Sequence, residues 1–261
     1  MSPGLVARLG TAAVLIAGLL AALLFLPRQW LAGVVAVIVG AAALEWARLC
    51  RLGADGAKLY AAAFITTYLI LVSAGVDRIV FATGAAFWLF VAIPWVLRGV
   101  APSQAPALAL AGFAILLPAA LAMVALRPAQ LILVIALTSI ADTAAYFCGR
   151  AWGRHKLAPA ISPGKSWEGA AAGLGAGLAY AIICAAWFDE AAWAPYVGAA
   201  ALLVVMSIFG DLFESAAKRQ AAVKDSGSIL PGHGGVLDRI DSATATLPLA
   251  ALLWPLLEGI K

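Results

Sequence analysis

The sequence contains very little charge. Only 11% of its 261 residues are Asp, Glu, Lys or Arg, whereas 64% are hydrophobic. Soluble domains carry about 25% charged and about 45–50% apolar residues, so this composition excludes a soluble enzyme. The net charge of +4 does not indicate a nucleic-acid-binding protein. About nine membrane crossings of roughly 20 residues each would leave no room for a separate soluble domain.

Cysteine and histidine are also scarce, with three and two residues respectively. No CxxC spacing is present, which argues against a zinc site or a redox pair. We predict that Cys50, Cys148 and Cys184 serve as small hydrophobic residues. An internal repeat, which many ion-coupled transporters possess, is likewise missing from the sequence.

Long apolar runs separated by Pro, Gly or charged residues predict an all-α, polytopic membrane bundle of about nine helices. The predicted spans are residues 9–26, 30–47, 59–75, 79–97, 107–126, 130–148, 169–188, 194–213 and 243–257. We divide the chain into N-terminal transmembrane helices, 1–140, and a catalytic transmembrane region, 141–261. The catalytic region contains two polar loops, 149–168 and 214–242.

The basic residues are distributed unequally between the two sides of this predicted bundle. The side of the N-terminus holds Arg8, Arg48, Arg51, Lys58, Arg98, Arg150, Arg154, Lys156, Lys165, Lys218, Arg219, Lys224 and Arg239. The opposite side holds only Arg28, Arg78, Arg127 and Lys261. The positive-inside rule therefore predicts a multi-pass protein of the cell membrane, with its N-terminus and both polar loops in the cytoplasm and its C-terminus outside.

Acidic residues within apolar runs are the first candidates for function, because a carboxylate at membrane depth is costly. Asp211 lies near the end of one such run, and Asp142 lies within another. Asp211, Glu214, Ser215 and Lys218 follow one another at helical spacing, so they share one face if the helix continues.

The segment 224–241 is rich in glycine and is predicted to form a shaped loop. Gly234 and Gly235 allow the backbone to approach a ligand or to turn amides toward an anion. Asp238 and Asp241 share a face at the start of the last helix. We expect Asp211 and Asp238 to converge and to bind Mg²⁺, which prefers oxygen ligands, with Asp142 and Asp241 as further candidates.

Acids that bind metal, bases that neutralise phosphate and a glycine loop are together typical of phosphoryl or nucleotidyl transfer. The candidate phosphate-binding residues are Lys165, Ser215, Lys218, Arg219, Lys224, Gly234, Gly235 and Arg239. Asp211, Lys218, His233 and Asp238 are the candidate catalytic residues. Gly164-Lys165-Ser166 is similar to the end of a P-loop, but the glycine required five residues earlier is Pro159.

The segment 215–241 resembles the signature of the phosphatidate cytidylyltransferase (CDP-diacylglycerol synthase) family. The matching residues are Ser215, Lys218, Arg219, Lys224, Asp225, Gly227, Pro231, His233, Gly234, Gly235, Asp238, Arg239 and Asp241. Ala217 departs from the pattern, since the family usually has a bulkier apolar residue there. Gly164 and Ser166 also stand where Lys and Thr are common. The resemblance covers residues 142–257 well, whereas residues 1–140 match only in being apolar helices.

The resemblance implies the reaction of CTP with phosphatidate to give CDP-diacylglycerol and pyrophosphate. It also implies a helical bundle in membrane lipid, a homodimer, and Mg²⁺ with K⁺ as a second candidate ion. His233 is expected to orient a phosphate or to assist the departure of pyrophosphate. Two alternatives remain open: a CTP-dependent lipid kinase of the polyprenol type, which transfers the γ-phosphate, and an ion-coupled membrane transporter.

Overall fold

The computed structural model describes residues 17–75, 77–188, 193–229 and 234–258. Within them it contains eight helices that are long and apolar enough to cross a membrane. This confirms the predicted all-α, multi-pass architecture. Residues 17–25 are helical and match the end of the first predicted span, whose earlier part lies outside the described residues.

The long helices follow the apolar runs of the sequence. They are α2 (Arg28–Leu49), α3 (Ala54–Ala74), α4 (Asp77–Phe87), α5 (Ile93–Arg98), α6 (Ala105–Ala125), α7 (Pro128–Trp152), α8 (Trp167–Trp187), α9 (Trp193–Gln220) and α10 (Leu237–Glu258). A π-helical turn, η1 (Trp88–Ala92), joins α4 to α5 in one span, and a 3₁₀ turn, η2 (Pro102–Gln104), precedes α6. The strands β1 (Lys156–Ala158) and β2 (Ser162–Ser166) form an antiparallel hairpin between α7 and α8.

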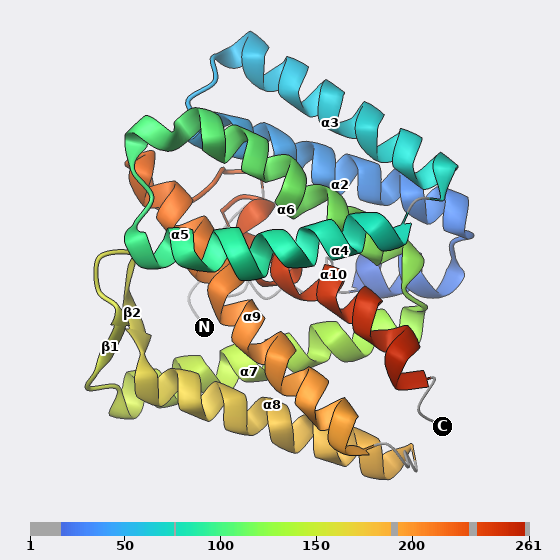
Figure 1. Ribbon diagram of the computed structural model, residues 1–261, viewed down its shortest axis with the longest axis vertical. Helices are drawn as coiled ribbons and strands as arrows, with labels where there is room; N and C mark the ends of the chain where they lie inside the picture. Colours follow the sequence, from blue (N-terminus) through green and yellow to red (C-terminus); the bar gives the residue numbers. More distant parts are fainter. Residues whose placement is uncertain (1–16, 76, 189–192, 230–233, 259–261) are drawn as a thin grey trace.

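The centre of the bundle is formed by α6 and α10. Helix α6 packs against α2, α3, α4 and α10, and α10 also contacts α7 and α9. Helices α3 and α8 lie at opposite edges (Figure 1). An aromatic cluster joins these layers, because Phe213 of α9 stacks on Trp46 of α2 and meets the edge of Trp88. The Trp88 indole also donates to the Thr244 carbonyl of α10, at 3.0 Å.

Glycines bring α7 and α8 into backbone contact. A Cβ on Gly169 would lie 2.7 Å from the Ala145 carbonyl oxygen, and a Cβ on Gly173 would lie 2.8 Å from that of Ala141. Close approach at small residues is how helices associate in a membrane. The α7–α8 pair therefore forms a tight unit with the hairpin at its end.

Both polar loops are shorter than predicted. Helix α9 continues to Gln220 and α10 begins at Leu237, so the second loop spans residues 221–236, which we call the glycine loop. Similarly, α7 continues to Trp152. A hydropathy pattern ends a predicted helix where polar residues begin. The last turns of α9 are nevertheless packed against protein, since Glu214, Ser215, Lys218 and Gln220 are all buried. The last turn of α7, in contrast, is exposed.

The glycine loop and the hairpin lie at the same end of the bundle, at the left of Figure 1, which we call the loop end. The end of α2 joins the end of α9 there, since Arg51 donates to the Gln220 carbonyl and the Gln220 amide donates to that of Leu49. At the opposite end, Arg28 pairs with Asp77. Helix ends thus alternate between the two ends, as expected for membrane crossings.

The cysteines are free thiols, as predicted. Cys50 and Cys184 are buried, and Cys148 is half-buried. Burial raises the pKa of the Cys50 thiol to about 12, so this group remains protonated and behaves as a small apolar side chain.

Candidate active site

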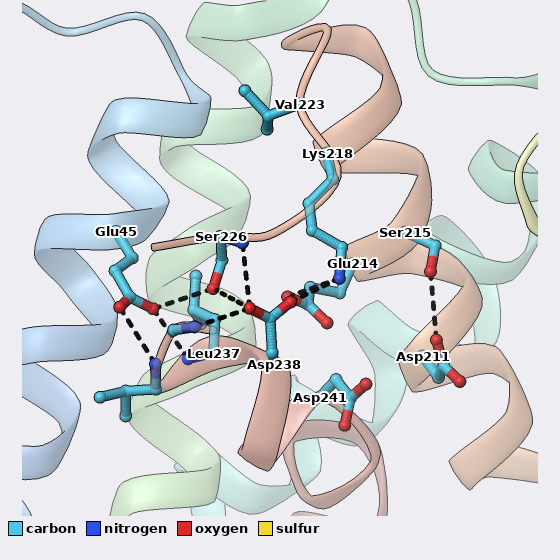
Figure 2. A network of polar contacts seen from close by, with 12 residues as sticks. Glu45, Asp211, Glu214, Ser215, Lys218, Val223, Ser226, Leu237, Asp238 and Asp241 are labelled. Atoms are coloured by element: carbon cyan, nitrogen blue, oxygen red, sulfur yellow. Dashed lines mark hydrogen bonds and ion pairs between the residues drawn. The ribbon is translucent and has the colours of Figure 1, made fainter. Parts of the chain in front are cut away.

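Glu45 of α2 binds the glycine loop through hydrogen bonds. Its side chain is completely buried. One carboxylate oxygen accepts the Val236 amide at 3.0 Å, and the other accepts the Leu237 amide at 2.9 Å and the Ser226 hydroxyl at 3.0 Å (Figure 2). These amides stand at the N-terminus of α10, where the helix dipole favours a negative charge. Three donors and the dipole compensate for the burial of this carboxylate.

The loop can approach Glu45 only because it lacks side chains at two positions. A Cβ on Gly227 would lie 2.4 Å from one oxygen of Glu45, and a Cβ on Gly235 would lie 2.4 Å from the other. Any larger residue would push the loop away from α2. Gly234 adds a left-handed turn, with φ of 82°. The glycines predicted to shape this loop therefore shape it around two internal carboxylates, Glu45 and Asp238.

Asp238, in the first turn of α10, binds both the loop and α9. Its Oδ2 accepts the Gly235 amide at 2.8 Å and the Ser226 amide at 3.0 Å. Its Oδ1 accepts the Lys218 ammonium at 2.6 Å. The Ser226 hydroxyl lies 3.0 Å from both Asp238 and Glu45, and its single hydrogen can be donated to one of them at a time. We call Glu45, Ser226 and Asp238 the loop anchor.

Glu214 lies beside this anchor in an unusual state. Its carboxylate is 3.3 Å from the Lys218 ammonium, one helical turn away. However, neither carboxylate oxygen has a hydrogen bond of acceptable geometry, although the side chain is buried. Glu214 and Asp241 line a small internal cavity and interact electrostatically. A buried carboxyl group without a hydrogen-bond partner is rare in proteins, so this position is a candidate functional centre.

Asp211, one turn before Ser215 on α9, lies on the side of this centre that is open to solvent. Its Oδ1 accepts the Ser215 hydroxyl at 3.1 Å, and its Oδ2 pairs with the Lys165 ammonium of β2 at 2.7 Å. Both partners in the ion pair are partly exposed. The hairpin thus places the ammonium group of Lys165 against Asp211, the acid that was predicted to lie at membrane depth.

Two further acids complete the group. Asp241 of α10 interacts electrostatically with Asp211, Asp142 and Lys165. Asp142 of α7 lies 3.5 Å from the hydroxyl of Ser242, which donates to it. We call Asp142, Asp211 and Asp241, with Lys165, the acidic cluster. It is built from three helices and the hairpin.

The structure brings most of the predicted site residues together at the loop end. Asp241 lies between Asp238 and Asp211 (Figure 2). Asp238 contacts Lys218, whereas Asp211 contacts Lys165. Arg219, Lys224 and Arg239 are exposed at the same end. His233 falls outside the described residues. In the part of the chain that is described, no three His, Cys, Asp or Glu side chains form a ready metal site.

Sequence reasoning missed Glu45. It lies in the predicted span 30–47, far in sequence from its partners Ser226 and Leu237. A signal was nevertheless present, since Glu45 is the first acidic residue of the chain and follows a long apolar run. An intramembrane acid should be treated as a functional candidate with a partner to be found.

Comparison with known proteins identifies the family of this chain. A family model described as the cytidylyltransferase family matches residues 6–257. A phosphatidate cytidylyltransferase of Pseudomonas aeruginosa is 48% identical over 151 residues, which cover 55% of this chain and 56% of that protein. One of Haemophilus influenzae is 46% identical over 45% of this chain and 43% of its own length. One of Thermotoga maritima is 38% identical over 51% of each. The chain spans about half the length of these curated relatives.

Proposed function

The chain belongs to the cytidylyltransferase family, and on that premise we propose that it transfers the cytidylyl group of CTP to phosphatidate, giving CDP-diacylglycerol and pyrophosphate. The observation that carries the proposal is the placement of the acidic cluster. Three acids and Lys165 meet at the loop end of a bundle whose described long helices are apolar enough to cross a membrane. A lipid phosphate and a water-soluble nucleotide can reach each other at such a boundary.

The chemistry we propose is an in-line displacement. A phosphate oxygen of phosphatidate forms a bond to the α-phosphorus of CTP, while the bond from that phosphorus to the bridging oxygen breaks and pyrophosphate leaves. The nucleophile is already an anion, so the protein is not required to supply a strong base. Its contribution is to position the phosphates and to neutralise their charge. Lys165, Lys218 and Arg219 lie at the loop end for this role.

The donor set suits Mg²⁺. Asp142, Asp211 and Asp241 offer only oxygen ligands, and the buried carboxyl group of Glu214, whose oxygens have no hydrogen-bond partner, interacts electrostatically with Asp241. Mg²⁺ is usually held by one or two carboxylates together with substrate phosphates, so a closed protein site is not required. A bound Mg²⁺ would neutralise charge on the transferring phosphates. Asp238 would join this set by exchanging its contact with Lys218. K⁺ is a second candidate ion.

The reaction is tested by following the nucleotide. Purified protein is incubated with phosphatidate and CTP labelled either at the α- or at the γ-phosphate. We expect the α-label to appear in lipid and the γ-label in pyrophosphate. In a parallel incubation with a polyprenol in place of phosphatidate, transfer of the γ-label to lipid with release of CDP would instead identify the CTP-dependent lipid kinase. The absence of label from the lipid in both incubations would exclude both reactions.

We also propose that the loop end faces the cytoplasm of a bacterial cell and that the protein forms a homodimer in the inner membrane. The unequal distribution of lysine and arginine supports this orientation, and the bacterial relatives support the membrane. Cytoplasmic CTP would then reach the site directly. The homodimer rests on the family resemblance.

Orientation has a direct test. Asp55 at the loop end and Arg28 at the other end both have exposed side chains. In intact cells, a membrane-impermeant maleimide should label Arg28→Cys and leave Asp55→Cys unlabelled until the cells are opened. The native cysteines are largely buried, and the unsubstituted protein gives their background. The reverse labelling pattern would invert the proposed topology.

A further inference from the structure

An apolar groove opens next to the acidic cluster. Its volume is about 550 Å³. Ligand pockets typically have volumes of about 300–1,000 Å³. The groove lies between α5, the hairpin, α8 and α9, and its wall includes Leu97, Leu157, Ile161, Ala171, Val205 and Leu212. These elements border the loop end at the left and lower left of Figure 1.

The hairpin contributes an apolar turn to this groove. Residues 157–161 read Leu-Ala-Pro-Ala-Ile within an otherwise polar connection, and all five line the groove. A turn that only linked two helices in water would be expected to carry polar residues. The apolar turn therefore forms part of the wall of the groove, together with α8 and α9.

Positive charge stands at the rim of the same groove. Arg219 donates from Nε to the carbonyl oxygen of Ile161 at 3.2 Å, which places its guanidinium beside the hairpin turn. Leu212 lines the groove, and its neighbour Asp211 holds the Lys165 ammonium at 2.7 Å. The apolar wall of the groove is therefore adjacent to the cationic groups of Arg219 and Lys165.

This arrangement is complementary to a molecule with an apolar chain and an anionic phosphate. We propose that the groove binds an acyl chain of the lipid substrate, so that its phosphate lies between Arg219 and Lys165, next to the acidic cluster. The inference rests on the proposed function and adds the binding place of the lipid. Bulk membrane lipid would gain the apolar contacts but would lack the match between a phosphate monoester and the two cations.

Filling the groove tests this inference. Ala171 of α8 is exposed and lines the groove, whereas Ala179 of the same helix is also exposed but lines none of the described cavities. Ala171→Phe should displace about two methylene groups and raise KM for a dioleoyl phosphatidate about tenfold, or about 1.4 kcal/mol. KM for CTP should stay unchanged, a dihexanoyl phosphatidate should be affected much less, and Ala179→Phe should behave as the unsubstituted protein.

A second measurement does not depend on turnover. Phosphatidate with a photoreactive diazirine on one acyl chain should label the hairpin or α8 in the unsubstituted protein, and Ala171→Phe should reduce that labelling. Equal effects of Ala171→Phe and Ala179→Phe, or equal labelling by a matched phosphatidylcholine, would overturn the groove assignment. If the unsubstituted protein forms no CDP-lipid but the labelling is specific, the proposed reaction fails while the binding site stands.

Discussion

Glu45→Gln is expected to lower turnover roughly 30-fold, which corresponds to about 2 kcal/mol. Glutamine keeps the size of the side chain, but its NH₂ group is a hydrogen-bond donor. This group would face backbone N–H groups or a hydroxyl that also need an acceptor. Depending on its orientation, it faces the Val236 amide or the Leu237 amide and the Ser226 hydroxyl. One or more buried N–H groups then lose their acceptor, and the glycine loop detaches from α2.

Two readouts separate this positioning role from a general loss of stability. We expect kcat to fall more than KM for CTP, and we expect faster tryptic cleavage after Lys224, which lies in the glycine loop and is exposed. Asp55→Asn removes one exposed carboxylate that has no contact with the loop, and it should leave both readouts unchanged. Normal turnover in Glu45→Gln, or lost turnover with an unaltered cleavage rate, would contradict the role of Glu45 as a loop anchor.

Asp211→Asn should lower turnover by at least about 100-fold with little change in expression or thermal stability. Asparagine retains the size and one carbonyl oxygen, but it removes a charge from the acidic cluster and weakens the contact with Lys165. Asp238→Asn should lose a similar amount. The double variant should be scarcely worse than either single one, because both acids act in one ion-dependent centre.

The measurement is turnover across a Mg²⁺ titration for the three variants, with excess EDTA as the starting point. We expect no turnover in EDTA and a higher Mg²⁺ requirement in Asp211→Asn. Asp77→Asn, at the opposite end of the bundle, is the control. Full activity in EDTA would refute the metal dependence. Losses that multiply in the double variant would show that Asp238 acts on the glycine loop through Ser226 and Gly235, separately from the ion.

Hydropathy alone predicted the spans well, because a helix that crosses lipid must be apolar over most of its length. Eight of the nine predicted spans match long helices of the described residues, and the first is represented by residues 17–25. The errors are at the loop end. There α9 and α10 continue into polar sequence. The last turns of α9 are packed against protein, with Glu214, Lys218 and Gln220 buried, and α10 begins at the buried Leu237, whose amide donates to Glu45.

The candidate site was only partly predictable for a related reason. Residues within one motif have fixed spacing, so the sequence predicted that Asp211, Ser215 and Lys218 would share a face if the helix continued beyond residue 213. Helix α9 does continue, to Gln220. Contacts between distant segments have no such spacing. Neither the pairing of Lys165 with Asp211 nor that of Glu45 with the glycine loop follows from periodicity. Both depend on how the helices pack, which the hydrophobic pattern does not determine.

The position of Glu45 has a consequence for the modularity of the chain. The candidate catalytic residues lie within residues 141–261, yet the carboxylate that binds the glycine loop comes from α2. A fragment beginning at residue 141 would keep every signature residue and lose the acceptor for the first amides of α10. The two regions therefore differ in sequence composition but do not form independent structural units. We expect that neither region could be exchanged without the other.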